Sequence, residues 1–408
     1  MEVLTLITGF ILGLGVFSFL EGCHSLKQGI RYFRFVQKFC GRSPGVFTPP
    51  VTLILPCKGI DMGFKENLSA YFEMNYPDWQ ILLVTGDASD PSVAVLEEIR
   101  ALYPHVTSHV LFSGKAYKRS QKVHNLLHSL DYLRDRDEIL AFGDSDIRPT
   151  RDWLKHLVSA LEDSHVGIST GYRWYLPQDG SCASVLRSVW NAGIASLMNE
   201  QNCRFAWGGA MSIRREIFQK CHVIDFWQNT LSDDYSISRA IHKYFLTIRF
   251  QPPCLSFSHE NCSMKQLLDW SARQLSITRI YDPGLWKVAL LFHVLNFLTL
   301  WGGGLIVTTS LWSGVFYMSD THRILGITIV LVYLLGCVKG WIRYSAVSSL
   351  FPQHAAALHK YRWAYVFLGP LASLITLWGM VCSLVSREIK WRGIRYRMVS
   401  PEETIIID

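Results

Sequence analysis

The stretch Ile139-Leu-Ala-Phe-Gly-Asp144-Ser-Asp146 decides the fold, because a short apolar run ends abruptly in two carboxylates with one residue between them. Apolar runs without polar alternation are typical of buried strands in a mainly parallel sheet. The carboxyl ends of such strands are where open α/β sheets bind ligands. Hard divalent ions prefer carboxylate oxygens and are often shared with substrate phosphates. Asp144 and Asp146 are therefore candidate metal ligands, although a turn or a helix cap is the favoured explanation of such a triplet when it is considered without the strand before it.

Four other apolar runs resemble this strand and lie on both sides of it in the sequence. They occupy residues 51–55, 79–84, 109–112 and 166–170, and segments with helical periodicity separate them. This alternation predicts an α/β domain over residues 49–285, with a mainly parallel sheet covered by helices.

Three of the predicted strands or helices carry further charged side chains at their ends. Lys58 follows the first strand, where it can approach a pyrophosphate, although an exposed surface lysine is the alternative. After the second strand, Asp90 is predicted to cap the helix near Pro91, which leaves Asp87 free to meet a ligand. Asp233 and Asp234 precede a helical run, so one of them caps it and the other is spare.

Adjacent carboxylates raise each other's pKa, which suits a general base that works near neutral pH. The spare carboxylate of Asp233 and Asp234 is therefore a candidate base. A later helix carries Trp270, Arg273 and Gln274 just before an apolar stretch. An arginine on this helix can bind an anionic leaving group through two hydrogen bonds, and the aromatic ring can cover the acceptor. The alternative is that the arginine only anchors the helix at the lipid head groups.

The composition points to a membrane. Hydrophobic residues make up 49% of the 408 residues and charged residues 18%, which is more apolar than a soluble enzyme needs. Residues 3–20 are predicted to be a retained anchor followed by a basic flank, and residues 288–318, 324–338 and 364–385 are predicted spans. The basic, aromatic stretch at residues 339–363 is predicted to lie in the membrane interface.

These four spans create a conflict in topology. They place the C-terminal tail opposite the α/β domain, whereas the five basic residues between positions 387 and 397 favour the cytosol for both. A re-entrant turn at Gly302-Gly-Gly304 would resolve the conflict. The predicted divisions are residues 1–22 (anchor), 23–48 (juxtamembrane), 49–285 (α/β domain), 286–386 (C-terminal helices) and 387–408 (basic tail).

Charge and cysteine usage argue against other classes of protein. The net charge of +7 forms no basic stripe, so nucleic acid is not an expected partner. Ten scattered cysteines, without metal-ligand spacing, predict reduced thiols rather than a zinc site or a disulfide framework.

The order of these motifs resembles glycosyltransferase family 2 and the related ceramide glucosyltransferases over about residues 50–285. Segments closest to the ceramide glucosyltransferases include Lys122-Val-His-Asn125 and the tail Trp391-Arg-Gly-Ile-Arg-Tyr-Arg397. The resemblance implies a GT-A fold inserted between transmembrane helices, a UDP-sugar donor, and Mg²⁺ or Mn²⁺. Asp87 would then lie near the uridine, Asp144 and Asp146 at the metal and diphosphate, and Asp234 would act as base.

The activity that this resemblance implies is inverting transfer of glucose or a related hexose to a membrane lipid hydroxyl, with a ceramide-like acceptor favoured. The enzyme would be a multi-pass membrane protein whose catalytic domain faces the cytosol, in a bacterial inner membrane or a eukaryotic internal membrane. A processive polysaccharide synthase and a non-catalytic membrane scaffold are the rival hypotheses.

One motif of these families, (Q/R)xxRW, has no clean copy in the chain. Trp270-Ser-Ala-Arg273-Gln274 and Gln266-Leu-Leu-Asp269-Trp270 both match it in part. The first is preferred because it keeps the arginine, so Arg273 is predicted to hold the leaving group, with Trp270 and Gln274 beside the donor.

Overall fold

The computed structural model describes residues 2–312 and 320–407, which form two compact units. The helical unit comprises the described residues up to Cys40, Asp179–Ser196 and Cys262–Val385. The sheet unit comprises Gly41–Gln178, Leu197–Asn261 and the described residues from Ser386 onward. The tail that follows residue 386 therefore belongs to the same unit as the sheet, although more than one hundred residues of the helical unit precede it.

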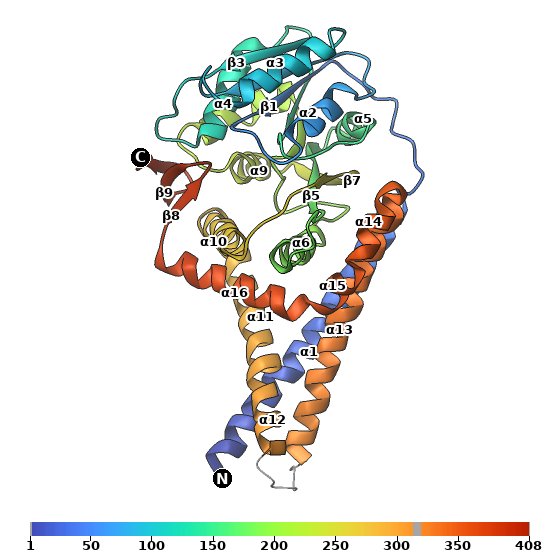
Figure 1. Ribbon diagram of the computed structural model, residues 1–408, viewed down its shortest axis with the longest axis vertical. Helices are drawn as coiled ribbons and strands as arrows, with labels where there is room; N and C mark the ends of the chain where they lie inside the picture. Colours follow the sequence, from blue (N-terminus) through green and yellow to red (C-terminus); the bar gives the residue numbers. More distant parts are fainter. Residues whose placement is uncertain (1, 313–319, 408) are drawn as a thin grey trace. The chain divides into compact units, whose positions relative to one another are not determined.

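Strands and helices alternate through most of the sheet unit (Figure 1). Its strands are β1 (Val51–Pro56), β2 (Trp79–Thr85), β3 (Ser108–Phe112), β4 (Ile139–Gly143), β5 (Val166–Tyr175), β6 (Ala210–Arg214), β7 (Thr247–Ser258), β8 (Glu388–Trp391), β9 (Ile394–Ser400) and β10 (Glu403–Ile406). Its α-helices are α2 (Phe64–Phe72), α3 (Ser92–Leu102), α4 (Gln121–Ser129), α5 (Trp153–Ser159), α7 (Arg215–Lys220), α8 (Val223–Trp227) and α9 (Asp233–Lys243).

Seven strands form the main sheet in the order β3-β2-β1-β4-β6-β5-β7. All neighbours pair in parallel except β6, which runs antiparallel to both β4 and β5. Ile54 of β1 lies opposite Leu82 of β2 and Phe142 of β4. This register brings the carboxyl ends of β1, β2 and β4 to one edge of the sheet, where the predicted charged residues follow.

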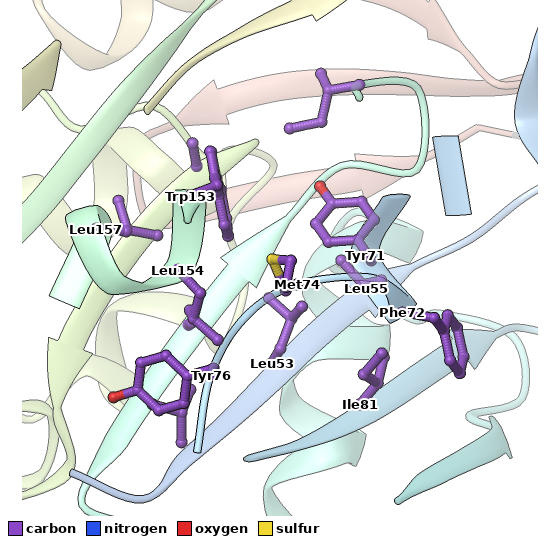
Figure 2. Close-up of a cluster of buried hydrophobic side chains, with 14 of the residues drawn as sticks. Leu53, Leu55, Tyr71, Phe72, Met74, Tyr76, Ile81, Trp153, Leu154 and Leu157 are labelled. Atoms are coloured by element: carbon purple, nitrogen blue, oxygen red, sulfur yellow. The ribbon is translucent and has the colours of Figure 1, made fainter. Parts of the chain in front are cut away.

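Helices cover both faces of this sheet, which is why its central strands are apolar throughout. On one face Leu53, Leu55 and Ile81 pack with residues of α2 and α5 (Figure 2). Tyr71 of α2 meets Trp153 of α5 edge to face, with ring centroids 5.9 Å apart. On the opposite face, Phe142 of β4 packs against Trp227 of α8.

The five predicted strands are all present, in a seven-stranded α/β sheet whose neighbouring strands are mostly parallel, as expected. The sequence reading missed β6, β7 and the separate three-stranded sheet β8–β10. Pro252 and Pro253 interrupt the pattern of β7, which lies at the sheet edge, where missing N–H donors are tolerated. The residues of the tail were interpreted by their charge and by their resemblance to the ceramide glucosyltransferases, not as strands.

The helical unit contains α1 (Glu2–Gln37), α6 (Cys182–Ala195), α10 (Met264–Tyr281), α11 (Pro283–Phe297), α12 (Gly303–Trp312), α13 (Asp320–Leu350), α14 (Ala355–Lys360), α15 (Arg362–Phe367) and α16 (Gly369–Val385). Three helical segments among the described residues are long and apolar enough to cross a membrane, namely Leu6–Gln37, Pro283–Trp312 and Asp320–Leu350. All ten cysteines are free.

The predicted count of four spans needs correction. Residues 364–385 are divided between α15 and α16, and the 17 residues of α16 fall short of the roughly 20 that a span needs. The predicted re-entrant turn is also wrong, because residues 283–312 run as one helical segment through a π-helical stretch at Leu298–Gly302. The end of the predicted span 288–318, from residue 313 on, lies outside the described residues. Three crossings put the sheet and the tail on the same side, which removes the conflict.

Candidate active site

The acidic triplet lies at the carboxyl edge of the sheet, where β4 ends at Gly143. The guanidinium of Arg173, in β5, donates hydrogen bonds to both carboxylates of the triplet. Its Nη1 and Nη2 donate to the two oxygens of Asp146 at 3.0 and 2.6 Å, and Nη2 also donates to Asp144 at 3.0 Å. The Arg173 guanidinium also lies 5.1 Å from the centre of the Trp207 ring. The two carboxylates are thus held in a fixed, charge-assisted arrangement.

Lys122 of α4 links the triplet to the second pair of carboxylates. Its Nζ lies 2.9 Å from Asp144 Oδ1 and 3.0 Å from Asp233 Oδ2. The Ser120 side chain caps α4 by accepting from the Val123 N–H, so the lysine projects from the first turn of a well-capped helix. One partly buried ammonium group therefore joins the end of β4 to the start of α9.

Two glycines let the backbone approach these carboxylates closely. A Cβ on Gly208 would lie 2.2 Å from an oxygen of Asp233, and one on Gly209 would lie 2.6 Å from an oxygen of Asp144. Both distances are far inside van der Waals contact, so any larger side chain would displace the acidic groups. The small-residue stretch at residues 206–211, interpreted as a close approach to a ligand or a tight turn, thus packs against the site's own carboxylates.

Asp233 and Asp234 begin α9, as predicted, but Ser232 is the residue whose side chain caps the helix. Asp233 is only 3% exposed, and burial raises its pKa to about 6 although Lys122 opposes the shift. Asp234 is half-buried; its Oδ1 accepts from the Ser232 hydroxyl and the Tyr235 N–H, and its Oδ2 accepts from the Gly208 N–H. The two neighbours therefore occupy different environments.

The pKa of Asp144 is shifted in the opposite direction from that of Asp233. Burial disfavours the charge on Asp144, but Lys122 and Arg173 outweigh burial, so the pKa of this carboxyl lies below its usual value. Asp144 therefore stays ionised near neutral pH. The Tyr71 hydroxyl donates to the Asp144 carbonyl oxygen at 2.9 Å, which fixes the backbone of the triplet as well as its side chains.

The charged residues after β1 and β2 lie beyond the same edge. Asp90 Oδ1 accepts from the Ser92 N–H at the start of α3 and from the Gly59 N–H, which ties down the first loop. The predicted cap needs correction, because Pro91 holds the N-cap position of α3 and no side chain caps the helix there. Asp87 is exposed, and hydrogen bonds from Ser89 lower its pKa. Burial lowers the pKa of Lys58.

The part of the chain that carries these motifs is similar to proteins of a known family. Residues 26–405 match the model for glycosyl transferase family 21. The chain belongs to this family. The predicted resemblance to ceramide glucosyltransferases is confirmed.

Three curated relatives of this family 21 chain are ceramide glucosyltransferases. The Komagataella phaffii protein is 29% identical over 140 residues, which cover 33% of the chain and 27% of the relative. The Candida albicans protein is 32% identical, over 27% of the chain and 22% of the relative. Ceramide glucosyltransferase 3 of Caenorhabditis elegans is 20% identical, over 85% and 72%. The matched stretch thus spans about a quarter of each fungal relative.

Solved structures give a more distant likeness. A Pyrobaculum calidifontis mannosyltransferase, solved with GDP-Man and Mn²⁺, is 16% identical with a TM-score of 0.48, covering 92% of the chain and 98% of that protein. Glucosyl-3-phosphoglycerate synthase from Mycobacterium tuberculosis, solved with Mn²⁺ and UDP-Glc, is 14% identical with a TM-score of 0.37, covering 58% and 84%.

The donor atoms of the family 21 chain fit a divalent cation. Ion pairs join five carboxylates to three cations, so the linked cluster has two more carboxylates than cations: Asp61, Asp144, Asp146, Asp233 and Glu260, with Lys122, Arg173 and Arg392. Over residues 2–312 and 320–407, no group of three or more acidic, histidine or cysteine side chains is arranged so that it could hold a metal ion by itself. A shared ion would therefore complete its coordination with substrate phosphates and water, as Mg²⁺ commonly does.

The remaining predicted site residues lie on α10, in the helical unit. Trp270 packs against Trp190 of α6, with ring centroids 4.6 Å apart, and Arg273 and Gln274 are half-buried. Gln266, from the alternative partial match to (Q/R)xxRW, forms a capping box with Ser263 at the start of α10. This structural use of Gln266 leaves Trp270 to Gln274 as the better partial match.

The sequence did not predict the roles of two central residues at the candidate active site of this family 21 chain. Lys122 appeared only within the motif Lys122-Val-His-Asn125, without a role. Arg173 was not singled out at all, although a charged residue beside Tyr172 and Trp174, just beyond a predicted strand, is an unusual feature. Both residues reach the acidic triplet through sheet and helix packing that sequence spacing does not show.

Proposed function

We propose that this family 21 enzyme transfers a hexose, glucose or a close relative, from a UDP-sugar to the hydroxyl of a ceramide-like membrane lipid. The arrangement of charges at the sheet edge carries the proposal. Arg173 and Lys122 hold Asp144 ionised, while Asp233 has a raised pKa and Asp234 lies beside it in a more accessible position. One edge thus offers a site for a metal diphosphate next to a carboxylate that can take a proton.

The protein's residues would act in a single displacement. Asp234 takes the proton of the acceptor hydroxyl, whose oxygen bonds to the anomeric carbon as the bond from that carbon to the diphosphate oxygen breaks. UDP leaves with the bonding electron pair, and the configuration is inverted. Ser232 and Gly208 orient the Asp234 carboxylate by donating to opposite oxygens. Such a base typically contributes about 10²–10⁴-fold to the rate.

Asp144 and Asp146 would hold Mg²⁺ or Mn²⁺ together with the donor diphosphate. When bound, the ion would neutralise the charge that develops on the departing nucleotide. Lys58 would approach the diphosphate, and Asp87 the uridine. Arg273, Trp270 and Gln274 remain proposed donor-side residues, with Arg273 at the leaving group.

A lipid acceptor agrees with the helices that are long and apolar enough to cross a membrane. With three crossings, the basic tail and the sheet share one side, and the tail's positive charge favours the cytosol for that side. The reactive hydroxyl of a sphingoid lipid lies at the interface, while its chains remain in the bilayer.

The test uses membranes from a host that makes no glucosylceramide and expresses the full chain. Incubation with UDP-glucose, ceramide and Mn²⁺, followed by mass spectrometry of the lipids, should reveal a hexosylceramide that Asp144→Ala membranes do not form. A panel of other UDP-hexoses and lipid alcohols identifies a related donor or acceptor. A soluble polymer in place of a glycolipid would overturn the proposal, and so would equal products from the wild type and the variant.

A further inference from the structure

The tip of the β8–β9 hairpin carries an arginine where the backbone favours other residues. Trp391 pairs with Ile394, so Arg392 and Gly393 form a two-residue turn, and both have positive φ, 51° and 86°. Hairpin turns of this kind favour Asn, Asp or Gly at the first central position. Residues other than glycine adopt positive φ only in a few per cent of cases. The local turn therefore does not account for an arginine at position 392.

The Arg392 side chain reaches the acidic cluster instead. Its two terminal nitrogens donate to the two oxygens of Asp61 at 2.6 Å each, and Nη2 lies 3.8 Å from Asp146 Oδ2. Asp61 belongs to the loop after β1, the loop that also carries Lys58. One side chain from the tail thus contacts that loop and approaches the metal-ligand candidate Asp146.

Three contacts of the tail fix the hairpin to the elements of the proposed site. The hydroxyl of Tyr396, which is 1% exposed, accepts from the Gln121 N–H at 3.2 Å, one residue from Lys122. Thr230 donates to the Pro401 carbonyl oxygen at 3.0 Å. Arg239 of α9, the helix that Asp233 and Asp234 begin, pairs with Glu402. The position of Arg392 is therefore tied to α4 and α9.

Charge coupling places Arg392 among the residues expected to meet phosphate. Its positive charge acts on Lys58, whose pKa is lowered mainly by burial. A guanidinium has five N–H donors, and the fork to Asp61 uses only two of them. The Arg392 side chain is 37% exposed, so it is open to a ligand.

We propose that Arg392 binds the diphosphate of the nucleotide donor together with Lys58, and that Asp61 orients the Arg392 guanidinium for this contact. Planar, bidentate recognition of phosphate is a property of arginine that lysine does not share. The tail hairpin would thus complete the donor site from within the sheet unit. This inference rests on the proposed use of a UDP-sugar.

The test measures UDP, UMP and uridine binding to the full-length protein in detergent with Mn²⁺, and the KM values for donor and acceptor. Arg392→Ala should weaken UDP binding and raise the donor KM by about 10–100-fold, since a hydrogen bond between charged groups is worth about 1.5–3 kcal/mol. Uridine binding and the acceptor KM should not change. Arg392→Lys, which keeps the charge and loses the fork, should give an intermediate loss.

Arg397→Ala is the matched control, because Arg397 lies on the same hairpin, pairs with Glu388 and is 54% exposed. This variant should bind UDP as the wild type does. Wild-type UDP affinity in both Arg392 variants would overturn the inference, as would an equal loss for uridine and UDP, which would indicate a purely structural role. If the wild-type protein itself does not bind UDP, the proposed donor fails together with this inference.

Discussion

Two pairs of aspartates lie at the same sheet edge and share Lys122, yet their surroundings differ. Asp144 and Asp146 meet the forked guanidinium of Arg173, and the pKa of Asp144 is lowered. Asp233 has Lys122 as its ion-pair partner and a pKa raised to about 6, while Asp234 is more accessible and accepts only from neutral donors in its described contacts.

This difference teaches that the local environment assigns different chemistry to identical side chains. A carboxylate kept ionised by two cations suits a metal or a diphosphate partner. A second pair at the start of a helix, in which the ammonium group meets Asp233 and Asp234 accepts from neutral donors, suits proton transfer. Pairs of titratable groups whose surroundings push their pKa values apart are a common basis for assigning such roles.

The largest expected effect separates the two members of the second pair. Asp234→Asn should lower kcat by about 10²–10⁴-fold with little change in the donor KM, because the base is lost while the diphosphate contacts remain. Asp233→Asn keeps the shape of a buried neighbour and should lose much less activity. Steady-state kinetics on the two variants decide the assignment, and the reverse order of effects would make Asp233 the base.

The next effect concerns the first pair and its metal. A chelator should abolish transfer, and added Mn²⁺ or Mg²⁺ should restore it. Asp146→Asn should raise the metal concentration for half-maximal activity at least tenfold, since loss of an outer-shell partner alone costs about 10–100-fold. Asp225→Asn, at a carboxylate that is 74% exposed, is the control. Full activity of the wild type in the chelator would exclude a role for a dissociable metal.

A smaller effect tests the backbone between the two pairs. Gly208→Ala would force its Cβ into Asp233 and should destabilise the protein by about 1–3 kcal/mol, with a matching fall in activity. Gly193→Ala is the same substitution at a helical glycine with nothing within 4 Å. It should be neutral, or stabilising by up to about 1 kcal/mol. Equal melting temperatures for both variants would show that the close approach at Gly208 is unimportant.

The smallest effect is a pH dependence of stability. The Asp233 carboxyl has a pKa of about 6 when folded against 3.8 as the reference, so between these values the folded protein binds more protons than the unfolded chain. Its stabilising contribution is complete below pH 3.8 and is lost as the pH rises through 6. The melting temperature of the wild type should therefore fall relative to Asp233→Asn over this window. Parallel profiles would contradict the raised pKa.

The sequence predicted the half of the sheet that depends on local pattern. Strands β1 to β4 are continuous apolar runs, and their charged ends needed only the rule that parallel strands finish at one edge. β6 was missed because Gly208 and Gly209 made its start look like a turn, and its reversed direction depends on pairing with β4 and β5. The partnership of Arg173 with the acidic triplet depends on the same non-local pairing.

The membrane helices show a second limit of local pattern. Apolar composition identified the segments but not their ends, because α15 stops at Phe367 and leaves α16 too short to span. The positive charge of the tail was interpreted as a sign that the tail lies on the cytosolic side of the membrane. Tyr396, buried within that tail, is a feature that charge counting does not detect.

The tail also sets an order of events during synthesis. Strand β1 begins at Val51, but the sheet unit is complete only after Ser386 and the residues beyond it have left the ribosome. The segments that separate them include two of the apolar helices expected to enter the membrane. The last strands of the sheet unit therefore leave the ribosome after these apolar helices, so a chain that stops before Glu388 lacks β8–β10 and, with them, Arg392.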